Sequence, residues 1–97
     1  MSGRELIRKR LVFRGAVQGV GFRWRARAAA HDAGATGWVR NNFDGSVTME
    51  LQGSEEQIDR VIQTLDHARY IRITSLEARH IPVEADERGF VTKDDLW

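Results

Sequence analysis

Residues 36–51, TGWVRNNFDGSVTMEL, contain two strand-forming segments with a turn between them. The first segment, residues 36–41, has the length and residue types of a short strand. Asp44 and Gly45 follow it, and this pair is a strong signal for a tight turn. In the second segment, residues 46–51, apolar side chains alternate with polar ones and so fall on one face of a strand. These apolar residues are Val47, Met49 and Leu51. We therefore expect a β-hairpin in the middle of the chain.

A helix is expected on each side of this hairpin. Before it, apolar residues recur at helical spacing at Phe22, Ala26, Ala29, Ala30 and Ala33. Gly34 then stands at the usual glycine position just beyond a helix end. After the hairpin, Ser54 and Gln57 have the spacing of a capping box, which marks a helix start. The apolar stripe of this second helix consists of Ile58, Val61, Ile62 and Leu65.

Three further strands complete the expected pattern. Residues 10–14, RLVFR, are apolar, β-branched and aromatic in their centre and stop at Gly15, which predicts a strand before the first helix. Residues 70–83 alternate in hydrophobicity, with an irregularity in the middle, and predict a strand after the second helix. A short last strand is expected near Gly89–Thr92.

The resulting order, β-α-β-β-α-β with a short extra strand, predicts an α+β fold of the ferredoxin-like βαββαβ type. Such a sandwich has a mainly antiparallel sheet, here of four to five strands, with two helices on one face. We expect one domain over residues 1–97, with residues 1–7 as a loose N-terminal lead. The same architecture hosts many unrelated activities, so the fold alone does not predict the function.

Composition and charge narrow the class of protein. The chain has 97 residues, 41% of them hydrophobic and 30% charged, which is typical of a small globular domain. No apolar run approaches the roughly 20 residues that a membrane span needs, and the N-terminus lacks the hydrophobic region of a signal peptide. We therefore expect a cytoplasmic protein without membrane contact. Residues 1–40 carry a net charge of +7 and residues 41–97 a net charge of −6. This asymmetry fits either a phosphate-facing side or an evenly mixed surface.

The segment Gly15–Arg27, GAVQGVGFRWRAR, combines three features that suit an anion. Gly19 and Gly21 allow a loop whose backbone N–H groups turn inward. The helix that begins near Phe22 has no capping side chain in front of it. Arginines occupy its first turns, where positive charge opposes the helix dipole. A bound phosphate would accept hydrogen bonds from the free N–H groups and offset the positive charge of the arginines. The glycines can also simply form a turn. The loop is neither a P-loop nor a dinucleotide fingerprint.

Other candidate groups are few. Asn41 falls at the end of a strand, where its amide can hold a water molecule or, as asparagine often does, help to form the turn. No serine stands in a nucleophile-elbow context, and the three histidines lie on separate elements without metal-ligand spacing. We therefore expect no metal site. We assign no special role to Trp24 or Trp38.

Two segments together resemble a known family. GAVQGVGFR (15–23) is similar to the first signature of the acylphosphatases, and GWVRN (37–41), followed by GSV (45–47) and a closing Gly53, is similar to the second. The resemblance is weak after about residue 70. Phe13 stands where the family more usually has an aliphatic residue, which concerns packing rather than chemistry.

The resemblance implies a role for each matching residue. Arg23 would bind the phosphate group and Asn41 would orient the attacking water, so these are the two expected catalytic residues. The expected phosphate-binding loop consists of Gly15, Ala16, Val17, Gln18, Gly19 and Val20. The resemblance implies a cofactor-free hydrolase of small-molecule acyl phosphates that releases inorganic phosphate. We further expect a monomer that binds no nucleic acid.

Two alternatives belong to other classes. RNA-recognition domains share the βαββαβ order, but they need exposed aromatic residues on their central strands, and the expected strands 10–14 and 46–51 offer only Phe13. A non-catalytic phosphate-binding module is the second alternative. The presence of both Arg23 and Asn41 argues against lost catalysis.

Overall fold

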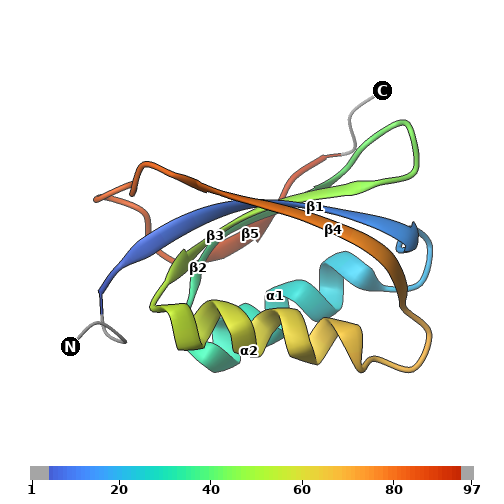
Figure 1. Cartoon of the computed structure of the whole chain (residues 1–97), viewed down its shortest axis with the longest axis horizontal. Coiled ribbons are helices and arrows are strands. Elements are labelled where there is room, and N and C mark those ends of the chain that lie inside the picture. Colours follow the sequence, from blue (N-terminus) through green and yellow to red (C-terminus); the bar gives the residue numbers. More distant parts are fainter. Residues whose placement is uncertain (1–4, 95–97) are drawn as a thin grey trace.

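The computed structural model describes residues 5–94 as a five-stranded sheet with two helices on one face (Figure 1). The elements are β1 (Ile7–Ala16), α1 (Phe22–Ala33), β2 (Thr36–Asn41), β3 (Val47–Gly53), α2 (Glu55–Asp66), β4 (Arg72–Ile81) and β5 (Phe90–Thr92). The predicted ferredoxin-like arrangement is confirmed. Between residues 5 and 94, neither helix is long and apolar enough to cross a membrane.

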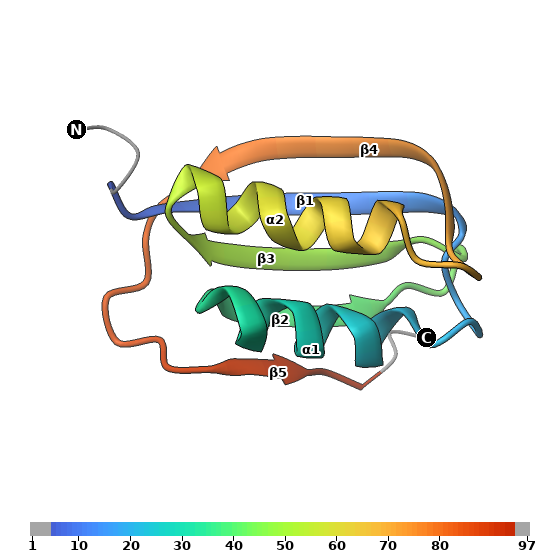
Figure 2. The same cartoon turned by 90° about the horizontal axis from the view of Figure 1, so that it is seen from below.

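The sheet has the strand order β4-β1-β3-β2-β5, which Figure 2 shows from the side of the helices. β3 is antiparallel to both of its neighbours, β1 and β2. β1 and β2 therefore run in the same direction, and both end at the same edge of the sheet. The loop after β1 and the turn after β2 lie together at this edge (Figure 2). β5 is parallel to β2, so the sheet is mixed rather than wholly antiparallel.

Several elements match the prediction closely, while β1 and β4 differ from it in length. β1 begins at Ile7, the last residue of the expected lead, because the cationic residues that follow still pair with both neighbouring strands. Residues 1–4 of that lead lie outside the described residues. The predicted irregularity in β4 is confirmed as a bulge: Arg14 pairs with Ser75 and Gly15 with Ile73, which leaves Thr74 between them without a partner in the register.

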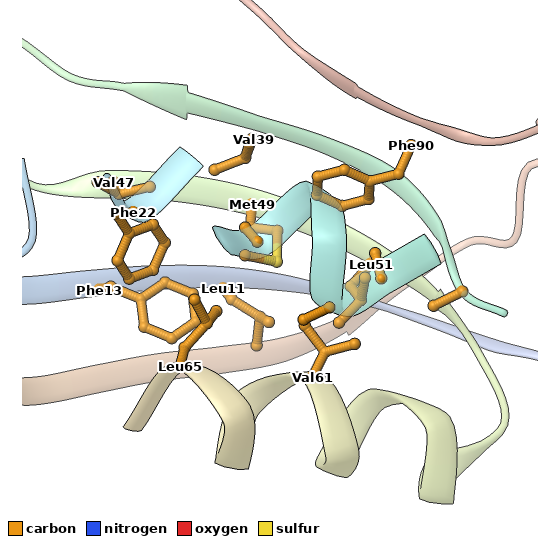
Figure 3. Packing of buried hydrophobic residues seen from close by; sticks show 14 of the residues in the cluster. Leu11, Phe13, Phe22, Val39, Val47, Met49, Leu51, Val61, Leu65 and Phe90 are labelled. Carbon is orange, nitrogen blue, oxygen red and sulfur yellow. The ribbon is translucent and has the colours of Figure 1, made fainter. Parts of the chain in front are cut away.

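The core lies between the sheet and the helices (Figure 3). The Phe22 ring, on the first residue of α1, packs on the Phe13 ring of β1 with 5.0 Å between centroids and planes tilted by 59°. Both side chains are almost fully buried. Burial of one phenylalanine side chain stabilises a fold by about 1.5–3 kcal/mol. This contact therefore fixes where α1 begins, and so positions the loop in front of it.

On the helix-free face, a buried arginine joins the sheet to the segment before β5. The side chain of Arg8 is 2% exposed and forms ion pairs with Glu50 at 3.0 Å and Glu87 at 2.7 Å. Burial alone would lower the pKa of Arg8, but the hydrogen bonds to Glu87 and Glu50 outweigh it and raise this pKa. Glu87 also accepts a hydrogen bond from Thr36 at 2.7 Å. This network holds the β4–β5 connection on the sheet.

Trp38 lies on the same helix-free face and is half-buried under cationic side chains. The Lys93 ammonium lies 4.2 Å from the ring centroid and the Arg40 guanidinium 5.0 Å from it. Cations at this distance over an indole are attracted by its quadrupole. Trp38 thus helps to keep Lys93 beside β2.

Candidate active site

The loop between β1 and α1 has the backbone that the sequence predicts for an anion site. Gly19 and Gly21 have φ angles of 74° and 79°, in the left-handed region that favours glycine. Gly21 is the N-cap of α1, no side chain caps the helix, and its first turn contains no acidic residue. The N–H groups of this first turn therefore have no side-chain acceptor. Together with the helix dipole they favour a negative charge in front of α1.

Arg23 is the second residue of α1, and the last part of the described chain contacts it. One guanidinium nitrogen, Nη1, donates to the backbone oxygen of Lys93 at 3.2 Å. The Lys93 N–H in turn donates to the carbonyl oxygen of Val39 in β2 at 2.8 Å. The sequence predicted no role for the segment after about residue 83. Within this segment, Lys93 is held on β2 and helps to orient the Arg23 side chain.

Asn41 is the last residue of β2, and its side chain is on the helix side of the sheet. Val39 is two residues before it on the same face and is fully buried, and Asn41 itself is 9% exposed. Its strand partner is Val47 at the start of β3. This placement results from the period of the strand, in which alternate side chains face the core.

Arg23 and Asn41 line the same pocket, which has a volume of about 220 Å³. Its lining residues are Val17, Gly19, Gly21, Phe22, Arg23, Trp24 and Asn41. Pockets for drug-sized ligands usually measure about 300–1,000 Å³, so this one suits a small anion. Within the part of the chain that the structure describes, no carboxylate and no imidazole lines this pocket. Among residues 5–94, no three histidine, aspartate or glutamate side chains are grouped so that they could hold a metal ion.

The six residues of the expected phosphate loop do not all face the pocket. Val17 and Gly19 line it. Gly15 and Ala16 belong to β1, where they pair with the start of β4 and are not among its lining residues. Val20 is half-buried and packs against the core.

Gln18 is directed to the hairpin rather than to the pocket. Its side-chain amide, Nε2, donates to the carbonyl oxygens of Asn42 at 2.6 Å and Ser46 at 2.8 Å. These two carbonyls flank the turn that follows Asn41. The side chain of Gln18 therefore braces the hairpin against the loop.

The hairpin turn has its own hydrogen-bond network. Asp44 accepts from the hydroxyl of Ser46 at 2.6 Å and from the N–H of the same residue at 2.9 Å. These hydrogen bonds from Ser46 lower the pKa of Asp44. The Asn42 side chain donates to Ser46 Oγ at 2.9 Å and Thr48 Oγ1 at 2.7 Å. The turn that carries Asn41 is thus fixed on both sides.

Trp24 is a pocket residue to which the sequence assigned no role. It follows Arg23 in the first turn of α1, and its side chain is 70% exposed. A large aromatic residue next to the expected phosphate-binding arginine, outside the apolar stripe of the helix, is a signal that could have singled it out.

Comparisons with known proteins agree on one family. A family model of the acylphosphatases matches residues 9–92. An acylphosphatase of Bifidobacterium longum is 38% identical over 79 residues, which are 80% of this chain and 81% of that protein. The structure of an acylphosphatase from Coxiella burnetii has a TM-score of 0.83 at 25% identity, with 96% of this chain and 100% of that chain covered.

A third likeness is to part of a much larger protein. The structure of full-length HypF in its phosphate- and nucleotide-bound form has a TM-score of 0.84 at 23% identity. The match covers 96% of this chain but 12% of the HypF chain. At this identity the likeness shows the fold alone.

The fold and the pocket at the start of α1 define a small ferredoxin-like α/β sandwich with an open site at one edge of its sheet. The chain belongs to the acylphosphatase family, whose model covers nearly all of it. Its activity is acylphosphatase, the hydrolysis of the carboxyl–phosphate bond of acyl phosphates.

Proposed function

We propose that the hydrolysis takes place in the pocket between Arg23 and Asn41. Arg23 and the backbone N–H groups of the loop from about Ala16 to Val20 hold the phosphate group, and Asn41 orients the attacking water. The observation that carries this proposal is that Arg23 and Asn41, from different elements, line one pocket in front of an uncapped helix start.

The groups at this site suit the chemistry of an acyl phosphate. The planar guanidinium of an arginine can hold two phosphate oxygens at once, and loop N–H groups can hold another. Phosphoryl transfer proceeds mainly through positioning and stabilisation of charge, so such groups contribute directly to the rate. The leaving group is a carboxylate, whose conjugate acid has a pKa of about 4. It departs without a proton, and the reaction therefore needs no general acid.

In the proposed step, the oxygen of water attacks phosphorus and the bond between phosphorus and the acyl oxygen breaks. The electron pair of that bond leaves with the carboxylate. The amide of Asn41 can accept a hydrogen bond from the water and donate another, which fixes the water in line with the breaking bond. Because no carboxylate or imidazole from residues 5–94 lines the pocket, the proton of the water passes to a phosphate oxygen of the substrate.

Hydrolysis of benzoyl phosphate, followed by ultraviolet absorbance, tests this proposal. The protein is treated with a chelator first, and Asn41→Ala is measured beside it. We expect turnover that survives the chelator and that Asn41→Ala loses. A folded protein that binds inorganic phosphate without turnover would overturn the proposal, and so would turnover that disappears with the chelator and returns with a metal.

The assembly and location of the protein are also part of the proposal. We propose a monomer in the cytoplasm that acts on small-molecule acyl phosphates without a nucleic-acid partner. Size-exclusion chromatography with light scattering tests the first point, with 11.1 kDa as the expected mass. Fractionation of the source cells tests the second.

A further inference from the structure

Trp24 stands at the border between the pocket and a second hollow. It lines the pocket that contains Arg23 and Asn41. It also lines a hollow of about 380 Å³ on α1, together with Arg27, Ala28, His31 and Asp32. Trp24 is therefore a lining residue that the two spaces share.

The second hollow leads away from the pocket along the helix. Trp24, Arg27, Ala28 and His31 are spaced at i, i+3, i+4 and i+7, so they share one face of α1. At a rise of about 1.5 Å per residue, this face extends for roughly 10 Å beyond the pocket. A group that leaves the pocket past Trp24 can lie along it.

The exposure of the indole is unusual for its size. The side chain of Trp24 is 70% exposed, whereas the ring of the neighbouring Phe22 is buried in the core. Tryptophan is highly buried on average, because its large ring gains most from leaving water. A single exposed aromatic residue is unremarkable on most surfaces. Here it borders the pocket that contains both expected catalytic residues.

We propose that Trp24 is the acyl-group subsite and that it selects acyl phosphates with a flat, apolar acyl group. This inference rests on the proposed function, because it requires the phosphate to be held beside Arg23. The acyl group must then point out of the pocket, and a planar one can stack on the indole. A two-carbon acyl group offers too little surface for this contact.

The contact with Trp24 is equally available to the bound substrate and to the transition state. Such uniform binding lowers KM and leaves kcat almost unchanged. Substituting Trp24 should therefore change KM to an extent that depends on the acyl group, and should leave the rate of the hydrolytic step almost unchanged. Substitutions of Arg23 and Asn41, in contrast, are expected to change kcat.

The test compares benzoyl phosphate with acetyl phosphate in the unmodified protein, Trp24→Ala and Trp24→Phe. For Trp24→Ala we expect kcat/KM for benzoyl phosphate to fall about tenfold, through KM, and kcat/KM for acetyl phosphate to change less than about twofold. Trp24→Phe, which retains a flat ring, should recover most of the loss. Inhibition by inorganic phosphate should be the same in all three proteins.

The outcomes separate this inference from the proposed function. If the unmodified protein hydrolyses acetyl phosphate but Trp24→Ala leaves the benzoyl-to-acetyl ratio unchanged, the subsite is wrong and the proposed function stands. An equal loss for both substrates also overturns it, since a merely structural role would act in that way. If neither substrate is hydrolysed, the proposed function fails and the inference fails with it.

Discussion

The side-chain amide of Gln18 donates a hydrogen bond of 2.6 Å to the carbonyl oxygen of Asn42. Asn42 directly follows Asn41, and the same amide group also reaches the carbonyl oxygen of Ser46 at 2.8 Å. The loop that is expected to hold the phosphate is therefore connected to the hairpin that carries the expected water-orienting residue. This one side chain therefore ties the two parts of the site together.

Gln18→Ala should consequently lower kcat by about tenfold or more, because a small displacement of a positioning group costs much of its rate effect. It should also reduce the free energy of unfolding by about 1–3 kcal/mol, since both hydrogen bonds from Gln18 are lost, while the carbonyl oxygens of Asn42 and Ser46 each keep a backbone N–H donor. Inhibition by inorganic phosphate should change little. Steady-state kinetics and urea unfolding measure these quantities. A normal kcat in a destabilised protein would limit Gln18 to a structural role.

Arg23→Ala should lose both phosphate affinity and turnover, because the guanidinium is expected to hold the phosphate in the bound state and in the transition state. We expect kcat/KM to fall by at least a hundredfold, the scale for removing one preorganised charge-stabilising group. Arg23→Lys keeps the charge but not the planar fork, and should recover only part of the loss. The measurement is kcat/KM for acetyl phosphate with phosphate inhibition beside it. Unchanged phosphate inhibition in Arg23→Ala would contradict the assigned role.

Asn41→Ala should lower turnover without weakening the binding of phosphate. Turnover should fall by about a hundredfold or more, while inhibition by inorganic phosphate survives, because Asn41 is expected to contact the water rather than the phosphate. Since Asn41 is buried at the end of β2, circular dichroism must first show that the variant is folded. Near-normal turnover in a folded variant would exclude the water-orienting role.

Much of this fold could be predicted because its local signals agree with one another. The hairpin, the capping box at Ser54 and the glycine that ends α1 are encoded by residues close together in the chain, and the structure confirms each. The bulge in β4 was also visible, as a break in alternation. Consistent local and global preferences are what make a sequence predictable.

The parts that could not be predicted depend on residues far apart in the chain. The bond from Arg23 to Lys93 joins a helix start to the end of β5, and the pairing of β5 beside β2 has no local signature. The buried ion pairs of Arg8 are a second case, because a surface-like pattern of charges along β1 hides a side chain that is 2% exposed. Trp24 differs from these cases, because its place next to Arg23 is visible in the sequence, whereas the second hollow beside it is visible only in the structure.

The Arg8 ion pairs predict how stability depends on pH. Burial alone would raise the pKa of Glu50, but the hydrogen bonds from Arg8 and Arg10 outweigh it, so this pKa lies below its usual value in the folded protein. A carboxylate whose pKa is lowered by folding contributes stability above its unfolded pKa of about 4.3, and this contribution is lost as the pH falls through the folded pKa. Glu50→Gln should therefore be less stable than the unmodified protein at pH 7, by roughly 1–3 kcal/mol.

The difference between the two proteins should shrink as the pH falls below about 4, because Glu50 of the unfolded chain is then protonated and, at still lower pH, Glu50 of the folded protein as well. Urea unfolding at pH 7, 5, 4 and 3 measures this difference directly. Asp44 also has a lowered pKa and keeps its own pH dependence in both proteins, so it cancels in the comparison. A difference that stays constant from pH 7 to pH 3 would mean that the ion pairs of Glu50 contribute no charge-dependent stability. The loss at pH 7 would then come from altered packing around the buried Arg8 side chain.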